Sequence, residues 1–234
     1  PFGELQAYLK QDGHPPLYYA LLHVWTGTMG TSTFAVRALS IIISLAGFPL
    51  TWLVARRAGG TRAALWAVAV WAILPYGVRY STETRMYVLV MVLVLAGWWF
   101  LGRLWSEPRW PDAAALAVIA SVLLWTHYWA MWLLAAVGAA TVLRRWLNRA
   151  LPNANRELLL TGGALGLAGL SFLPWVPTLL FQAERTGTPW GAVERPTTAV
   201  VITLIDFAGQ PSAEPQLMTY VLVFLIVVAL VGRA

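Results

Sequence analysis

The sequence predicts an all-α, polytopic transmembrane helical bundle, and three observations support this fold class. Hydrophobic residues make up 59% of the 234-residue chain and charged residues only 11%, whereas soluble domains average about 25% charged residues. Apolar runs of membrane-spanning length, about 20 residues, recur along the chain. The charged residues lie mainly between these runs. A soluble core of this size could not bury so many apolar runs, so the bilayer is the expected solvent.

About seven segments are expected to lie in the membrane. In chain order they are 33–55, 63–78, 86–102, two helices within 113–143, then 158–181 and 216–232. The run 113–143 is too long for one span. Its interruption by Thr126-His127-Tyr128 predicts that two helices meet there. Residues 15–28 are short for a span, and the sequence leaves open whether they cross the bilayer or lie in its interface.

Further along, the run 158–181 holds three glycines, Gly162, Gly166 and Gly169. Small residues of this kind let membrane helices approach closely, and that role is expected here. Residues 198–205 are apolar but short, and 206–215 are expected to form a loop before the last span.

The connections between spans predict the orientation of the chain. Arginines are densest at 56–62 and 144–157, and the positive-inside rule places both segments in the cytoplasm. Counting spans from there puts 79–85, 126–128 and 182–197 on the outer side. The net charge is +6, with a single lysine and no cysteine. Because the arginines flank apolar runs, the lipid bilayer is the expected partner and nucleic acid is not. The absence of cysteine excludes disulfides, thiolate catalysis and cysteine-ligated metals within this stretch.

Three polar sites are therefore expected to gather on one face of the membrane. The first runs from Asp12 to Tyr19 and contains His14 and the pair Pro15-Pro16. A helix cap with a turn is as good an explanation of it as a functional site.

The second site runs from Arg79 to Tyr87, with Arg79 and Arg85 on either side of Glu83. Ionisable groups at a membrane boundary are costly unless paired, so an interfacial salt bridge is one explanation. Arginine also presents a planar fork of donors suited to phosphate oxygens, so a phosphate-binding site is the other.

The third site is Thr126-His127-Tyr128, within an otherwise apolar run. A lone histidine on an apolar face is more often a hydrogen-bonded structural residue. A broken helix at membrane depth, however, is tolerated mainly where it lines a cavity or water, so the structural and functional explanations stand about equal. A weaker fourth site is the loop 182–197, for which an ordinary solvated loop is the better explanation.

Taken in order, four short motifs resemble one family. They are HPPLYY at 14–19, the Arg37-Ala38-Leu39-Ser40 segment, E-x-R-M-Y from Glu83 to Tyr87, and T-H-Y at 126–128. The set is similar to the bacterial branch of the GT-C glycosyltransferases, the protein-mannosyltransferase-like and aminoarabinose-transferase-like enzymes. The resemblance covers residues 10–185, while 198–234 matches only as generic spans.

The resemblance implies an enzyme of the bacterial cytoplasmic membrane with its active site facing outward. It would transfer a mannose-like or arabinose-like sugar from a polyprenyl-phosphate donor to a glycan, glycolipid or protein acceptor. In the family the general base is an acidic residue of the first outer loop. Residues 1–234 are accordingly expected to be a single transmembrane domain, a fragment that lacks the N-terminal span and that loop. The base is thus expected before Pro1, with Asp12 as a weak candidate.

The resemblance also assigns roles to the three sites. Arg85, helped by Arg79 and His14, would bind the donor phosphate. Some relatives have lysine at the position of His14, so its role stays open. The remaining residues would support or line the pocket: Glu83, Tyr87, His127, Tyr128 and Tyr18.

Neither a cofactor nor a metal site is predicted, although a divalent cation remains open because some GT-C enzymes use one. Two alternatives also remain open. A secondary transporter would share broken helices and intramembrane charges, but the charges here cluster at span ends and no repeat is visible. A non-catalytic membrane subunit of the same fold is the other alternative.

Overall fold

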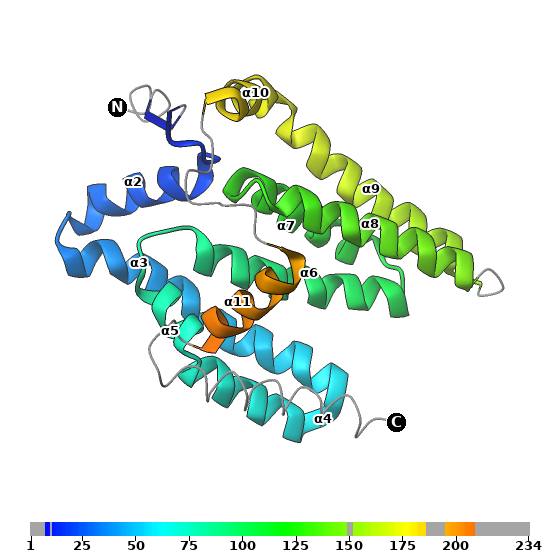
Figure 1. Ribbon diagram of the computed structural model, residues 1–234. Helices are drawn as coiled ribbons and strands as arrows, with labels where there is room; N and C mark the ends of the chain where they lie inside the picture. Colours follow the sequence, from blue (N-terminus) through cyan, green and yellow to red (C-terminus); the bar gives the residue numbers. More distant parts are fainter. Residues whose placement is uncertain (1–7, 10, 149–151, 186–194, 209–234) are drawn as a thin grey trace.

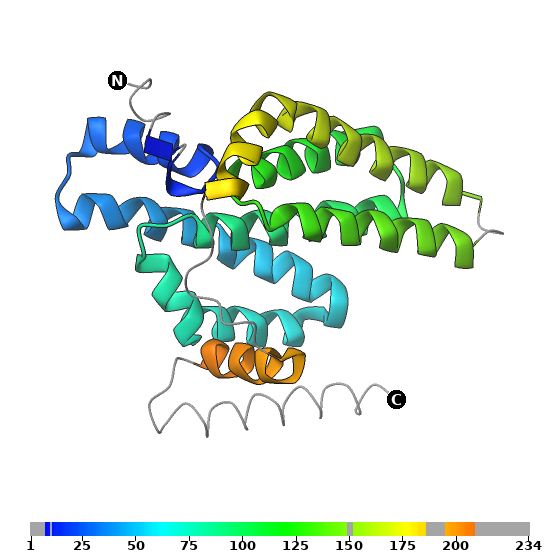
Figure 2. The same cartoon turned by 45° about the horizontal axis from the view of Figure 1, so that its top comes forward.

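The computed structural model describes residues 8–9, 11–148, 152–185 and 195–208, and in these it is helical without strands. Figures 1 and 2 show helices running back and forth, with their connections at two opposite ends of the bundle. The elements are α2 (Leu17–Met29), α3 (Thr33–Leu45), α4 (Gly47–Ile73), α5 (Pro75–Thr82), α6 (Tyr87–Ser106), α7 (Trp110–Thr126), α8 (Ala130–Leu147), α9 (Ala154–Phe172), the 3₁₀ turn η1 (Leu173–Trp175), α10 (Val176–Arg185) and α11 (Pro196–Ala208).

The all-α membrane fold is confirmed in the described residues. Four helical stretches are long and apolar enough to cross a membrane: Thr33–Ile73, Tyr87–Ser106, Ala130–Leu147 and Ala154–Arg185. The first of them reverses at Gly59-Gly60, where Gly60 has a φ of 77° that favours glycine. With the shorter apolar helix α7, these stretches account for six of the expected segments. The seventh, 216–232, lies outside the described residues.

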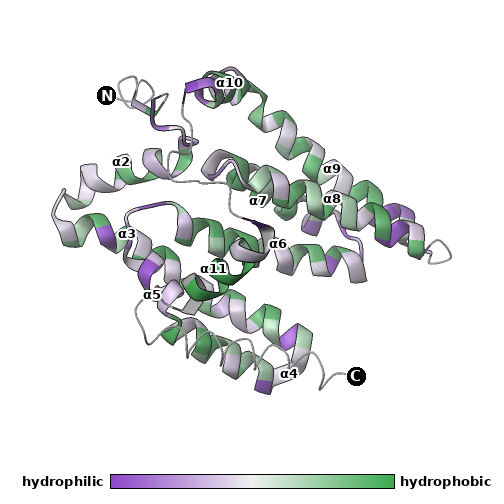
Figure 3. Ribbon diagram, in the orientation of Figure 1, coloured by the Kyte–Doolittle hydropathy of each residue, from purple (hydrophilic) through white to green (hydrophobic). Residues whose placement is uncertain are grey.

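The outer surface of the bundle is apolar, as a lipid-facing surface requires. Figure 3 shows green, hydrophobic helix bodies with the purple, hydrophilic residues toward the helix ends. On α8, Trp129 and Trp132 at the start and Trp146 near the end are 73%, 74% and 58% exposed. Tryptophan favours the two membrane interfaces, so these side chains indicate where α8 enters and leaves the bilayer.

The centre of the bundle is the packing of α7 between α6 and α9. Ala113 and Ala117 of α7 lie in one buried cluster with Ala164 of α9, and Ala120 lies in a second with Ala168. The expectation that Gly162, Gly166 and Gly169 provide this close approach is wrong. A Cβ at any of the three would meet nothing within 4 Å. The alanines face α7 and the glycines do not.

Other boundaries differ from the expected ones. The polar island at 78–85 is helical as far as Thr82, because Pro75 begins α5 and the side chains of Ser81 and Thr82 bond to carbonyls of the preceding turn. Helix α9 begins at Ala154 rather than 158. Helix α10 extends to Arg185, into the expected loop, and α11 extends past 205 to Ala208.

Two ion pairs hold the basic end of the bundle together. Arg103 Nε lies 2.6 Å from Asp112 Oδ1, which joins α6 to α7, and Arg144 Nε lies 2.9 Å from Glu157 Oε2, which joins α8 to α9. Both carboxylates are nearly buried. The arginine-rich connections 56–62 and 144–157 both lie at this end. The positive-inside rule would therefore assign this end to the cytoplasm.

Candidate functional site

The polar segments singled out in the sequence meet at the opposite end of the bundle. The ring of Tyr87, at the start of α6, lies 6.2 Å from that of His127, at the α7–α8 junction. His14 is close enough to His127 to affect its titration. The structure therefore brings three segments far apart in the chain close together at this end.

A buried chain of hydrogen bonds fixes this arrangement. The Tyr18 hydroxyl lies 2.9 Å from Ser40 Oγ, and Ser40 Oγ donates to the carbonyl oxygen of Glu83 at 2.8 Å. Tyr18, Leu39 and Met86 also form one buried apolar cluster. The first three resembling motifs are thus bonded to one another. Tyr18 is fully buried. It therefore cannot contact a ligand at the surface, and it acts by holding Ser40 and the Glu83 backbone in place.

Arg85 is a cation at the edge of the site. Its side chain is half exposed, and its Nε lies 3.9 Å from Glu83 Oε1, a loose ion pair. The neighbouring Tyr87 side chain raises the pKa of Arg85, and nearby Tyr19 and Glu83 act in the same direction. Arg85 is therefore a permanent positive charge, held beside the site with one face open to solvent.

His14 and Asp12 form a local pair on a tight turn. His14 Nδ1 lies 3.0 Å from the carbonyl oxygen of Asp12 and 3.1 Å from its Oδ2. Both partners accept hydrogen bonds, so Nδ1 carries a proton and Nε2 points elsewhere. Gly13 between them has a φ of 75°, which favours glycine. The ring of Tyr19 packs edge-on at 6.2 Å from that of His14.

His127 ends α7 with an extended backbone. Its Nδ1 accepts the backbone N–H of Trp129 at 3.2 Å, which places the ring proton on Nε2 of the neutral imidazole. Burial lowers the pKa of His127, and the nearby charge of His14 lowers it further. His127 is therefore a neutral hydrogen-bond donor at neutral pH.

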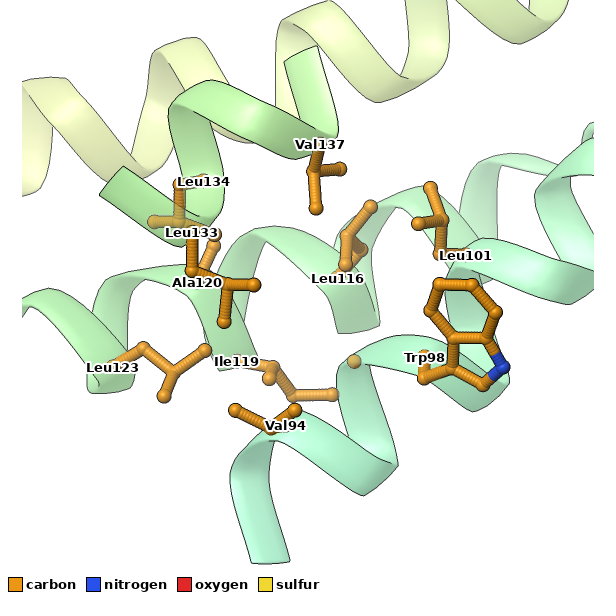
Figure 4. A pocket seen from close by; sticks show the side chains of 11 residues that line it. Val94, Trp98, Leu101, Leu116, Ile119, Ala120, Leu123, Leu133, Leu134 and Val137 are labelled. Atoms are coloured by element: carbon orange, nitrogen blue, oxygen red, sulfur yellow. The ribbon is translucent and has the colours of Figure 1, made fainter. Parts of the chain in front are cut away.

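Tyr87 and His127 line a hollow of about 200 Å³. Its other lining residues come from α5, α6, α7 and α8: Tyr76, Val90, Met91, Leu123, Trp129, Ala130 and Leu133. Leu123 and Leu133 also line a smaller apolar hollow of about 50 Å³ between α6, α7 and α8. Figure 4 shows aliphatic side chains and Trp98 around this second hollow. A polar mouth therefore adjoins an apolar interior.

Two predicted site residues lie beside this mouth rather than in it. Arg79 is exposed on α5, with its guanidinium carbon 5.7 Å from the centre of the Tyr80 ring. The Tyr128 side chain points toward α10. Its hydroxyl donates a hydrogen bond to Gln182 Oε1 and accepts one from the Trp175 Nε1–H at 2.9 Å. Gln182 Nε2 in turn donates to the Leu9 carbonyl oxygen at 2.7 Å. Tyr128 thus ties the site to α10.

The sequence analysis gave no role to Tyr19, Ser40 or Gln182. Tyr19 and Ser40 lie in the resembling motifs and Gln182 at the start of the fourth site, but nothing in the sequence shows which partners their side chains meet. Of the weak fourth site, Glu184 and Arg185 are exposed, with Arg185 4.0 Å above the Phe181 ring. Residues 186–194 lie outside the described residues. Among those described, no group of three or more His, Asp or Glu side chains could hold a metal ion.

The fold and this site together define a polytopic integral membrane protein with a cationic, aromatic site at one end of its helices. Residues 13–175 match the model of the family described as dolichyl-phosphate-mannose-protein mannosyltransferase. The match spans more than half of the chain, so the chain belongs to this family and is a membrane glycosyltransferase. No curated protein and no solved structure matches it. The membership favours a transferase over the transporter alternative.

Proposed function

We propose that the chain transfers a sugar from a polyprenyl-phosphate donor to an acceptor at the outer face of the membrane. The observation that supports this most is that Tyr87 and His127 line a hollow next to an apolar one, with the cation of Arg85 two residues before Tyr87. The family's description names mannose on a dolichyl phosphate as donor and a protein as acceptor. Mannose is therefore the first sugar to test, with arabinose as the second.

The two hollows match the two ends of such a donor. Arg85 offers a fixed positive charge and a fork of donors for the phosphate. The neutral His127 and the Tyr87 hydroxyl would hydrogen-bond phosphate or sugar oxygens. The apolar hollow behind Leu123 and Leu133 would take the first isoprenoid units of the carrier (Figure 4). The rest of the isoprenoid chain would lie on the exposed apolar surface of the helices.

The chemistry then follows from the charges. The acceptor hydroxyl oxygen attacks the anomeric carbon, a carboxylate takes the hydroxyl proton, and the bond between that carbon and the phosphate oxygen breaks. The polyprenyl phosphate leaves with the bond's electron pair, and Arg85 stabilises its negative charge. Glu83 orients Arg85 across the 3.9 Å ion pair. Asp12 orients His14, whose Nε2 is left to contact the phosphate.

The test uses the full chain in proteoliposomes with polyprenyl-phosphate mannose or arabinose and a membrane extract as acceptor source. Release of polyprenyl phosphate is the readout. Arg85→Gln should lower the rate by about a hundredfold, as loss of a group that stabilises developing charge does. Arg85→Lys should recover part of it, because charge returns without the fork.

Arg109→Gln is the matched control, since Arg109 is an exposed arginine paired with Glu107 at the other end of the bundle. It should transfer at the wild-type rate. All variants should unfold at the wild-type temperature in detergent. Full turnover in a folded Arg85→Gln protein would overturn the assignment of the phosphate site. No turnover with either donor in the wild type would favour a non-catalytic subunit. Addition of a chelator decides whether a divalent cation takes part.

A further inference from the structure

We propose that the end of the bundle opposite the candidate site holds a second lipid site, which binds the phosphate headgroup of an anionic phospholipid. The proposal does not depend on the transfer reaction, because it uses none of the residues that would bind the donor phosphate; this second hollow shares Trp98 and Leu101 with the apolar hollow proposed for the carrier chain.

A hollow of about 320 Å³ opens at this end between α4, α6 and α8. Arg57 and Arg144 line it from opposite sides, and Ser106 lies at the end of α6. Its remaining lining residues are aromatic, aliphatic or small: Val54, Ala58, Trp98, Trp99, Leu101, Gly102 and Trp105. The hollow therefore combines two cations with an apolar, tryptophan-rich wall.

Both guanidinium groups are held in place by the last turns of α6. Arg57 donates to the Gly102 carbonyl oxygen at 2.8 Å and to Ser106 Oγ, and Arg144 donates to the Trp105 carbonyl oxygen at 2.9 Å. The guanidinium carbons lie 5.9 Å from the ring centre of Trp99 and 5.3 Å from that of Trp105. A guanidinium has five N–H donors, so these bonds orient it and leave donors for a ligand.

The charge around the hollow favours an anion. Within the described parts of the three connections at this end, 56–62, 103–112 and 144–157, eight arginines face three carboxylates. Asp112 and Glu157 are already paired with Arg103 and Arg144, and Glu107 with Arg109. Arg57 has no carboxylate within ion-pair distance among the described residues, so its charge is the one that a ligand would neutralise.

The surroundings favour a lipid headgroup over a phosphate ion from solution. Trp98 and Leu101 line both this hollow and the apolar hollow of Figure 4, and the Trp98 side chain is 57% exposed. Basic pockets between membrane helices bind anionic headgroups while the acyl chains lie on the apolar helix surface. A phosphate ion would gain nothing from the aromatic and aliphatic walls.

The test titrates the full chain, purified in a neutral detergent, with phosphatidylglycerol, phosphatidylcholine or inorganic phosphate. Bound lipid is counted by native mass spectrometry, and the unfolding temperature is measured in parallel. Phosphatidylglycerol alone should bind saturably and raise the unfolding temperature. Arg57→Gln should weaken this binding about tenfold or more, the size expected for lost charged hydrogen bonds. Arg56→Gln is the matched control, because it removes an equally exposed arginine next in sequence that does not line the hollow.

A second variant removes the space and keeps every charge. A Cβ added at Gly102 would lie 3.4 Å from Arg57 Nε, so Gly102→Leu should fill the hollow and displace the Arg57 side chain. It should abolish phosphatidylglycerol binding while transfer from the sugar donor continues. Equal losses in Arg57→Gln and Arg56→Gln would overturn the proposal in favour of diffuse attraction to charge. Equal stabilisation by inorganic phosphate would overturn it in favour of a site for soluble anions, and equal binding of phosphatidylcholine would remove the role of headgroup charge.

Discussion

The ring of Tyr87 lies 6.2 Å from the imidazole of His127, with the two planes inclined at 44°. Tyr87 is also the residue that does most to raise the pKa of Arg85. It therefore lies between the arginine, just before α6, and the histidine, at the junction of α7 and α8. The position of Tyr87 therefore affects both Arg85 and His127, and separate substitutions can test its hydroxyl and the histidine.

Tyr87→Phe keeps the ring beside His127 and removes the hydroxyl that is proposed to hydrogen-bond the donor. We expect kcat/KM for the polyprenyl-phosphate sugar to fall about tenfold, the cost of one hydrogen bond to a charged group. The measurement is release of polyprenyl phosphate in proteoliposomes. Tyr80→Phe is the control, because the Tyr80 ring packs 4.8 Å from that of Tyr87 and Phe preserves that packing. Equal losses in the two variants would contradict the role given to the Tyr87 hydroxyl.

His127 should make the stability of the protein depend on pH. Burial, and then the charge of His14, lower the pKa of His127 in the folded protein below the value of about 6.5 expected for the unfolded chain. Between these two values the unfolded chain binds more protons, so the free energy of unfolding rises with pH. The stability due to the neutral ring is complete above about pH 6.5 and is lost as the pH falls toward the folded-state pKa.

His127→Asn tests this dependence, since its Oδ1 can still accept the Trp129 N–H that Nδ1 accepts in the native protein. The measurement is the unfolding temperature in detergent from about pH 8 down to about pH 5, the range in which histidine titrates. The wild type should lose stability on acidification more steeply than the variant, and the two curves should converge above about pH 7. Parallel curves over the whole range would show that His127 is not the group responsible.

Those features of the site that depend on the order of polar and apolar residues could be predicted from the sequence. The break at Thr126-His127-Tyr128 was predictable because the apolar run 113–143 is too long for one span and these three residues are its polar interruption. The turn at Gly59-Gly60 follows from two glycines after two arginines. The meeting of the three polar segments at one end followed from counting spans.

The features that depend on which way a side chain points could not be predicted. Ser40 and Gln182 look like isolated polar residues in helices, yet Ser40 bonds to Glu83 and Gln182 to Leu9. Helices facing lipid on one side and protein on the other are apolar all round, so hydrophobic periodicity does not show which face is buried. For the same reason Gly162 and Gly166 were expected at a helix contact that alanines make instead.

The proposed orientation can be tested by labelling, because the chain has no native cysteine. Thr82→Cys lies on α5 beside the candidate site, and Thr61→Cys lies at the turn within α4 at the basic end; both positions are exposed. In intact bacterial cells a membrane-impermeant maleimide should label Thr82→Cys only. Thr61→Cys should react only after the membrane is permeabilised. The reverse pattern would place the candidate site in the cytoplasm and rule out transfer at the outer face.

The close packing of the two halves of α4 makes Gly47 a sensitive position. A Cβ added there would lie 2.2 and 2.6 Å from two ring atoms of Trp71, closer than any real contact, so the rigid indole or the helix would have to move. Trp71 lies just before α5, and its carbonyl oxygen is 3.3 Å from where a Cβ on Gly77 would be. A shift of Trp71 would therefore reach α5 and the turn that leads to Arg85.

Gly47→Ala should destabilise the protein by about 1–3 kcal/mol, the usual cost of overpacking. Gly166→Ala is the matched control in α9, where the added methyl group would meet nothing within 4 Å. Alanine is the better helix former by about 0.5–1 kcal/mol, so this variant should be as stable as the wild type or more so. Unfolding by sodium dodecyl sulfate, followed by loss of helical circular dichroism, measures both. If Gly47→Ala unfolds like Gly166→Ala, the two halves of α4 do not pack as closely as the Trp71 contact requires.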